Sequence, residues 1–210
     1  MPIKVLIADD HQLVRQGLRA LLEREGFNVT GEASNGQEAL KLAETLHPEV
    51  AVLDFAMPLL NGIETVREIQ RISSKIKCII LTMHTDCRYI LEALRGGAKG
   101  FVMKTHAAED LVRAIREAAH GGTYLSPEVS EAVVQAYQNK TELPADPLSP
   151  RERQVLQLIA EGKSTKEVAC TLDISVKTAE TYRTRIMGKL DIHETASLVR
   201  YAVRRGVVQP

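Results

Sequence analysis

The feature that most constrains the fold is a fivefold alternation of short apolar runs with longer segments of helical periodicity. The apolar runs lie at residues 3–8, 29–33, 50–54, 77–82 and 99–103. Each is followed by a stretch whose apolar residues recur at intervals of three and four. Strands that alternate with helices in this way form a parallel sheet covered by helices. We therefore predict an α/β domain with a five-stranded, doubly wound parallel sheet at residues 1–120.

Polar residues stand at the carboxyl ends of four of these predicted strands. Each has an ordinary explanation when taken alone, such as helix capping or a solvated loop. In an open parallel sheet, however, these strand ends meet at one edge, where ligands bind. Three carboxylates that meet there repel one another and favour a hard cation such as Mg²⁺. The residues are Asp9 and Asp10 after the first strand, Asp54 at the third, Thr82 at the fourth and Lys104 at the fifth.

This arrangement also suits a phosphoryl acceptor. Phosphoryl transfer depends mainly on positioning and on neutralisation of charge. A carboxylate such as Asp54, held between a cation and the ammonium group of Lys104, meets both requirements. The sequence therefore makes Asp54 the candidate acceptor.

The alternation ends after residue 120, and the charge of the chain changes sign farther on. A helix is predicted to begin at Ser126-Pro127, and the stretch 139–147 contains two prolines, as linkers often do. The net charge is −4 for residues 1–147 and +4 for residues 148–210. A basic segment makes nucleic acid a candidate partner. We predict a linker with a helix at residues 121–145 and a second domain at residues 146–210.

Four helical segments are predicted in the second domain. Ser149, Pro150 and Glu152 form the start signal of the first helix, with a capping serine and a glutamate three residues later. A short second helix is joined by a tight turn at Asp173-Ile174 to a longer, basic third helix that Ser175 caps. Two helices connected in this way form a helix-turn-helix, in which the second helix enters a DNA groove.

The third helix has an apolar side and a polar side when its residues are placed at about 100° intervals. The polar side carries basic and hydroxyl side chains that suit a DNA groove, although a merely solvated helix face would have the same composition. The apolar side comprises Val176, Ala179, Ile186, Met187 and Leu190. The opposite side comprises Lys177, Thr181, Thr184, Arg185 and Gly188.

The strand-end residues, together with Met57-Pro58 and Gly62, resemble the receiver domain of bacterial two-component response regulators over residues 3–119. This resemblance implies a flavodoxin-like fold, phosphorylation of Asp54 and a sensor histidine kinase as the phosphoryl donor. It also implies a switch after phosphorylation, in which Lys104 pairs with the phosphoryl oxygens, Thr82 moves toward them and Phe101 turns inward. The implied Mg²⁺ ligands are Asp9, Asp10, Asp54 and the backbone carbonyl of Ala56.

A second resemblance covers residues 146–208. The stretches 148–156, 161–169 and 174–181 are similar to the LuxR-type helix-turn-helix, so the whole chain resembles a NarL/FixJ-type response regulator. The resemblance implies binding to double-stranded DNA as a homodimer, and the final helix is our candidate dimer contact through Ala196, Val199, Ala202 and Val203. Ala179 and Tyr182 depart from the usual valine and histidine of the family. The candidate DNA-binding residues are Lys163, Lys166, Lys177, Thr178, Glu180, Thr181, Arg183, Thr184, Arg185 and Lys189.

Other functional classes fit the sequence less well, and we do not expect an enzyme. Aspartate-nucleophile phosphatases need a second acid two residues after the first, but Ala56 occupies that position. A dinucleotide enzyme is disfavoured because Asp9-Asp10-His11 replaces a GxGxxG turn. A DNA-binding protein with a silent receiver is disfavoured by the complete set of strand-end residues. The three cysteines lack metal-binding spacing, and the absence of a signal peptide or long apolar stretch predicts a cytoplasmic protein without a membrane span.

Overall fold

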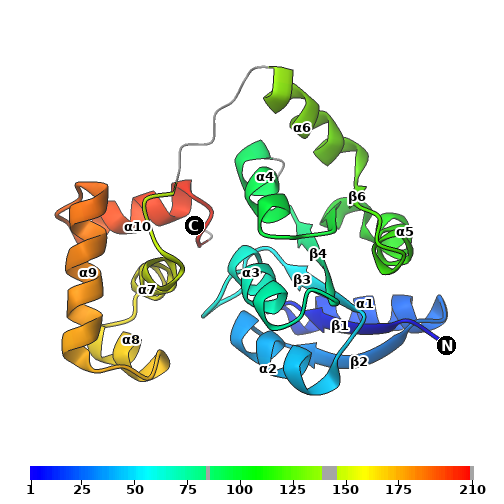
Figure 1. The fold of residues 1–210 in the computed structure, drawn as a ribbon, viewed down its shortest axis with the longest axis horizontal. Helices are drawn as coiled ribbons and strands as arrows, with labels where there is room; N and C mark the ends of the chain where they lie inside the picture. Colours follow the sequence, from blue (N-terminus) through cyan, green and yellow to red (C-terminus); the bar gives the residue numbers. More distant parts are fainter. Residues whose placement is uncertain (84–85, 139–145, 209–210) are drawn as a thin grey trace. The chain divides into compact units, whose positions relative to one another are not determined.

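The computed structural model describes residues 1–83, 86–138 and 146–208, and the chain divides into two compact units. Unit 1 comprises Met1–Glu142, and unit 2 comprises Leu143–Pro210 (Figure 1). Segment 139–145, which the sequence assigns to the predicted linker, lies outside the described residues. In the described parts of the chain, no helix has the length and apolar character needed to cross a membrane.

Unit 1 is built on a parallel sheet with the strand order β2-β1-β3-β4-β5-β6. The five predicted strands are confirmed, but the predicted strand number is too low because β6 adds a short sixth strand beside β5. Two residues are too few to produce a periodic sequence pattern, which explains why β6 was missed. The strands are β1 Lys4–Ala8, β2 Asn28–Ala33, β3 Val50–Asp54, β4 Lys77–Thr82, β5 Gly100–Met103 and β6 Tyr124–Leu125.

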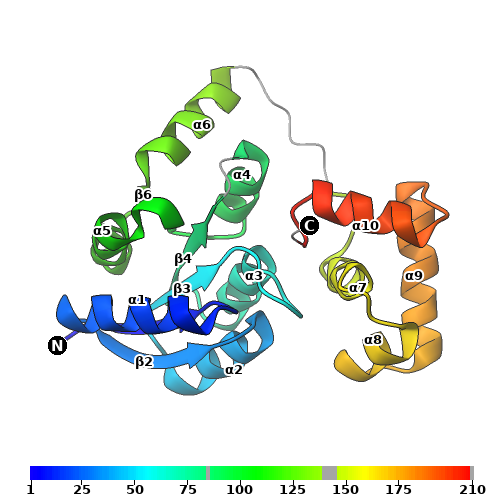
Figure 2. The ribbon, with the colours of Figure 1, turned by 180° about the vertical axis from the view of Figure 1, so that it is seen from behind.

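Helices cover both faces of this sheet (Figures 1 and 2). Helices α1 and α5 pack on one face, and α2, α3, α4 and α6 contribute to the core on the other. Helix α6 belongs to unit 1 because Val129 is fully buried in that second core and α6 packs against α4 and β5. The helices are α1 Gln12–Arg24, α2 Gly36–Leu46, α3 Gly62–Ile72, α4 Cys87–Arg95, α5 Ala107–Ala119 and α6 Pro127–Gln138.

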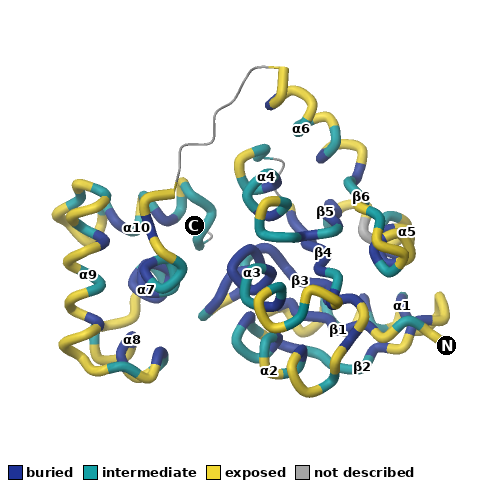
Figure 3. Tube along the Cα trace, viewed as in Figure 1, coloured by how far each residue is buried: buried dark blue, intermediate teal, exposed yellow. Residues whose placement is uncertain are grey.

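The central strands are buried on both faces, as the dark blue trace of Figure 3 shows. Successive side chains of a strand point to opposite faces of the sheet. Accordingly, Val5 and Ile7 of β1 belong to the core beneath α1 and α5, whereas Leu6 belongs to the core beneath α2 and α3. The continuous apolar runs of the sequence follow from this two-sided burial.

The described part of unit 2, residues 146–208, contains four helices, as predicted: α7 Pro150–Ala160, α8 Thr165–Thr171, α9 Val176–Leu190 and α10 Thr195–Arg204. The predicted capping box is present, since the Ser149 side chain accepts from the Glu152 N–H and the Glu152 carboxylate accepts from the Ser149 N–H. One residue of the predicted dimer contact is wrong, because Ala202 is fully buried within the unit. Val176, the first residue of α9 on its apolar side, is 41% exposed.

Candidate functional site

The candidate phosphoryl-acceptor site lies at the carboxyl edge of the sheet in unit 1. The chain leaves β1 toward β2 on one side and later enters β3 on the other side of β1, so β1 and β3 flank the point where the topology reverses. Ligands bind at such a switch point in open α/β sheets. Asp9 and Asp10 directly follow β1, and Asp54 ends β3.

Lys104 joins the two buried carboxylates of this site. Its Nζ lies 2.7 Å from Asp9 Oδ2 and 2.8 Å from Asp54 Oδ1. Asp9 and Asp54 are both buried, whereas the Asp10 side chain is 36% exposed. Three carboxylates and one ammonium group leave a formal charge of −2 at full ionisation. The structure thus brings the predicted Asp9, Asp10, Asp54 and Lys104 together.

Burial and charge act on Asp54 in opposite directions. Burial, which disfavours the charged form, raises the pKa of Asp54 to about 6, and the negative charges of Asp9 and Asp10 contribute to the rise. The ammonium group of Lys104 opposes this shift. Burial also disfavours the charge of Lys104, but the neighbouring carboxylates outweigh it and raise the lysine pKa above its ordinary value. At neutral pH, Asp54 is therefore an ionised, poorly solvated carboxylate.

Backbone contacts hold the acidic loops in place. The Arg15 Nη1 donates to the backbone oxygen of Asp9 at 2.6 Å, which ties α1 to the end of β1. Gly62 donates its N–H to Phe55 O at 2.9 Å, and a side chain at position 62 would collide with the backbone of Asp54. Glycine at position 62 thus lets the start of α3 approach the acceptor strand closely. The sequence pattern includes Gly62 but not Arg15, because helical periodicity does not show that this partly buried side chain reaches back to the end of β1.

The remaining predicted residues of this site lie around it. Thr82 is buried at the end of β4, next to the register partner of Asp54, Leu81. Phe101 on β5 is fully buried in the core. Ala56 lies two residues beyond β3 and packs against the same core. Lys104 opens a short 3₁₀ turn, and the bond to Thr105 is trans.

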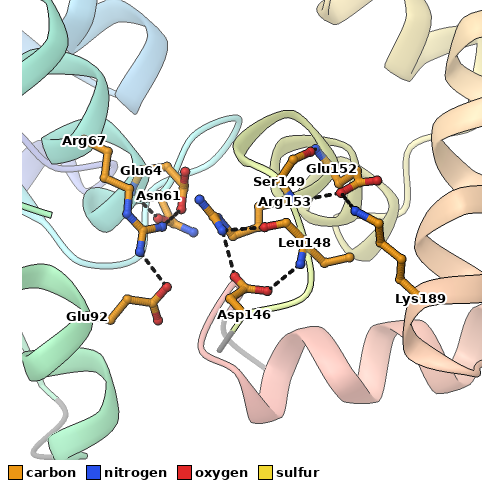
Figure 4. Close-up of polar contacts among 10 residues, drawn as sticks. All are labelled: Asn61, Glu64, Arg67, Glu92, Asp146, Leu148, Ser149, Glu152, Arg153 and Lys189. Carbon is orange, nitrogen blue, oxygen red and sulfur yellow. Dashed lines mark hydrogen bonds and ion pairs between the residues drawn. The ribbon is translucent and has the colours of Figure 1, made fainter. Parts of the chain in front are cut away.

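Two contacts join α3 and the end of β3 to α4. Arg67 of α3 contacts Glu64 on its own helix and donates to Glu92 of α4 at 2.8 Å (Figure 4). Phe55, directly after Asp54, packs on Tyr89 of α4 with ring centroids 5.3 Å apart. Residues beside the acceptor therefore contact α4 directly, which gives a local change at Asp54 a path to that helix.

In unit 2, the predicted helix-turn-helix has a well-defined turn. Helix α8 ends through Asp173, which adopts the left-handed conformation with φ 51°. Aspartate tolerates this conformation better than most residues. The Ile174 N–H closes the turn on Ala169 O at 3.0 Å, and the Ser175 side chain then caps α9 by accepting from the Thr178 N–H. Arg151 of α7 also donates to Leu172 O at 2.7 Å.

The candidate DNA-binding residues lie on the outside of unit 2. Nine of the ten are exposed, and Arg183 is partly exposed. The hydroxyls of Thr181 and Thr184 donate to backbone oxygens one turn earlier in α9, at 2.9 and 3.0 Å. These hydroxyl oxygens still have free acceptor capacity toward a ligand.

Two of the ten residues, Lys189 and Arg183, make described contacts to a neighbouring helix of unit 2. Lys189 Nζ lies 2.7 Å from Glu152 Oε2 on α7 (Figure 4). Arg183 Nη2 donates to Thr195 Oγ1 on α10 at 2.6 Å. Both cations therefore fasten α9 to neighbouring helices, a role that the sequence pattern did not reveal because the partners are distant in sequence.

Comparisons with known proteins identify the families of the two parts of the chain. Residues 5–116 match the family model described as the response regulator receiver domain, and residues 146–202 match the model described as bacterial regulatory proteins, luxR family. This chain is a two-component response regulator. Its two matches divide as the sequence predicts, with the receiver first and the LuxR-type domain second.

Full-length relatives support the same assignment for this response regulator. The response regulator UvrY of Escherichia coli K12 is 38% identical over 208 residues, covering 98% of this chain and 95% of UvrY. The transcriptional regulatory protein LiaR of Bacillus subtilis 168 is 38% identical over 209 residues, covering 98% and 99%. RcsB of Salmonella enterica serovar Typhimurium, solved bound to the rprA promoter with the phosphomimetic BeF₃⁻, has a TM-score of 0.64 and 29% identity, covering 96% and 98%. The family consists of transcription regulators rather than enzymes.

Proposed function

We propose that Asp54 is the residue of this response regulator that accepts the phosphoryl group of a sensor histidine kinase. The contact of Lys104 with both Asp9 and Asp54 carries this proposal, because it places a cation beside the acceptor oxygen at the switch point of the sheet. An Asp54 carboxylate oxygen would form a bond to phosphorus while the bond from phosphorus to the kinase histidine nitrogen breaks. The product is an aspartyl phosphate.

The acidic cluster is suited to Mg²⁺. A formal charge of −2 and oxygen donors match a divalent hard cation. Asp10, Asp54 and the backbone carbonyl of Ala56 would be direct ligands, and Asp9 would act mainly through water. When bound, the cation supplies neutralisation of the charge on the transferring phosphoryl group. Lys104 would contact a phosphoryl oxygen from its present place, and the Thr82 hydroxyl would donate to another.

Unit 2 is proposed to bind promoter DNA as a homodimer. Helix α9 would enter the major groove with Glu180, Thr181 and Thr184 toward base edges, and Lys177 toward the phosphates. Arg183 and Lys189, whose side chains also contact neighbouring helices, are further candidates for phosphate contacts. The RcsB structures with DNA, one of which has two dimers bound to two parallel DNAs, support this proposal. On α10, Ala196, Val199 and Val203 are at least partly exposed and remain candidates for the dimer contact. A regulator of chromosomal promoters works in the cytoplasm, and we propose that location.

Phosphorylation can be tested directly with Asp54→Asn, which keeps the shape of the side chain but removes the nucleophilic carboxylate. Wild-type protein incubated with acetyl phosphate and Mg²⁺ should gain one phosphoryl group, measured by intact-protein mass spectrometry. The variant should gain none. Asp191→Asn, which removes an exposed carboxylate in unit 2, is the control and should be phosphorylated normally. Full phosphoryl uptake by Asp54→Asn would refute the assignment.

A further inference from the structure

We propose that His11 supplies a nitrogen ligand to the cation bound by Asp9, Asp10 and Asp54, and so gives the site a selective affinity for late first-row metals such as Co²⁺ and Zn²⁺. This inference rests on the proposed function in one respect, because it requires that these carboxylates hold a cation. It adds a nitrogen donor, which strengthens a preference for these metals that carboxylates alone show more weakly.

The positions of the donor atoms carry the proposal. His11 Nδ1 lies 2.7 Å from Asp10 Oδ1 and 3.4 Å from Asp9 Oδ1. One ligand atom from each of Asp9, Asp10, His11 and Asp54 lies within 4.8 Å of all the others. A cation with bonds of about 2.1 Å holds adjacent ligands about 3 Å apart and opposite ligands about 4.2 Å apart. Asp10, Asp54 and His11 therefore fit around one ion as direct ligands after small side-chain movements, with Asp9 close enough to act through water.

The imidazole is placed at the open side of the cluster. The His11 backbone N–H donates to Asp9 Oδ1 at 2.9 Å, which fixes the start of the side chain beside the carboxylates. The His11 side chain is 67% exposed, so no surrounding core holds the ring in a single orientation. A cation that enters from solvent can therefore bind the ring nitrogen without disturbing packed residues.

The chemistry of the donors then separates the metals. Imidazole nitrogen suits Co²⁺, Ni²⁺, Cu²⁺ and Zn²⁺, whereas Mg²⁺ prefers oxygen ligands and keeps several waters. Mg²⁺ is thus held by the carboxylates and water, and its affinity is nearly independent of His11. Co²⁺ and Zn²⁺ use the same carboxylates together with the imidazole. Because both kinds of cation share Asp10 and Asp54, they compete for one site.

The test measures cation binding to the full-length, unphosphorylated protein at pH 7.5 by calorimetry, with Co²⁺ and Mg²⁺ as separate titrants. Visible absorption follows the Co²⁺ environment and its displacement by added Mg²⁺. His11→Ala and His11→Gln should weaken Co²⁺ binding at least about 10-fold and change Mg²⁺ affinity less than about twofold. His120→Ala is the matched control, since His120 is an exposed receiver histidine bonded only to Arg116 O among the contacts described for it, and both affinities should stay unchanged.

The outcomes separate this inference from the proposed function. Unchanged Co²⁺ affinity in the two His11 variants, or an equal loss of Co²⁺ and Mg²⁺ affinity, overturns the role of His11 while leaving the carboxylate site standing. Mg²⁺ binding that is insensitive to Asp10→Asn would instead remove the proposed carboxylate site itself. Circular dichroism checks that each variant is folded. If His11→Ala is not folded, the affinities of His11→Gln decide the test.

Discussion

At the scale of a single residue, the buried charge of Asp54 lowers the stability of the folded protein. Its carboxylate is buried, and the charge of Lys104 only partly offsets the cost of removing it from water. A group whose pKa is raised on folding binds its proton more tightly in the folded state than in the unfolded state. Stability therefore falls as the pH rises from the ordinary value of 3.8 through about 6, and the loss is complete above that window.

This effect predicts that Asp54→Asn stabilises the metal-free protein at neutral pH. Asparagine keeps the shape without the buried charge, so the free energy of unfolding at pH 7.5 should rise relative to wild type by up to about 3 kcal/mol. The gain should shrink as the pH falls to about 4.5, where wild-type Asp54 is protonated when folded. Urea unfolding with EDTA at several pH values measures it. Asp191→Asn should show no such trend, and a gain independent of pH would contradict the explanation.

Single residues also show what could be predicted from the sequence. The strand-end residues were identifiable because each follows an apolar run whose length defines where the strand stops. The ion pair of Lys189 with Glu152 could not be predicted, since 37 residues separate the partners. Likewise, placing residues at about 100° intervals puts Val176 on the apolar side of α9. Only the structure shows that this first residue of the helix is exposed.

At the scale of the helix, α9 must be both exposed to DNA and fixed to unit 2. The Lys189–Glu152 pair contributes to the second task, since Glu152 is buried and Lys189 is 43% exposed. We predict that Lys189→Gln lowers the free energy of unfolding by about 1 kcal/mol, a value discounted for solvent screening. A double-mutant cycle with Glu152→Gln should show coupling between the two residues.

DNA titrations over a range of salt concentrations then separate the two roles of Lys189. A phosphate contact changes the slope of log K against log salt by about 1. Lys177→Gln, at an exposed candidate contact, should show that change, whereas Lys189→Gln should leave the slope nearly unaltered. A full change of slope with Lys189→Gln and no loss of stability would make Lys189 a phosphate contact after all.

Gly188 is a second feature of α9 that local structure explains only in part. A Cβ at this position would meet no other atom within 4 Å, so packing does not require glycine. We predict that Gly188→Ala raises the free energy of unfolding of unit 2 by about 1 kcal/mol through helix propensity. Thermal or urea unfolding measures this. A fall in stability would show that the glycine is needed for the fold, and a loss of DNA affinity despite higher stability would indicate close approach of the backbone to DNA.

At the scale of the whole molecule, the proposed phosphorylation of Asp54 would have to act on α9, which lies in another unit. Phosphorylation adds about 1.5 to 2 negative charges at one edge of the sheet. Within unit 1, Phe55 contacts Tyr89 of α4, and α4 packs against α6, the last described helix before unit 2. These contacts of α4 are candidates for transmitting the change.

The simplest coupling is that the unphosphorylated receiver masks the DNA-binding or dimerising surface of unit 2. Reversing a 99:1 masked population requires about 5.5 kcal/mol of differential stabilisation, which several charge-assisted hydrogen bonds at the new phosphoryl group can approach. Masking predicts that residues 146–210 alone bind promoter DNA without phosphorylation, and at least as tightly as the unphosphorylated full chain. Unit 2 has its own buried core, with Val155, Leu158 and Leu198 fully buried, which supports independent folding.

The decisive comparison titrates one promoter fragment at a fixed salt concentration with three proteins. These are residues 146–210, the unphosphorylated full chain and the full chain phosphorylated with acetyl phosphate. Masking requires the fragment and the phosphorylated chain to bind more tightly than the unphosphorylated chain, with Asp54→Asn remaining at the unphosphorylated level. If the fragment instead binds more weakly than the unphosphorylated chain, the receiver assists binding. The coupling would then be dimerisation driven by the receiver, and sedimentation of the phosphorylated chain should show the dimer.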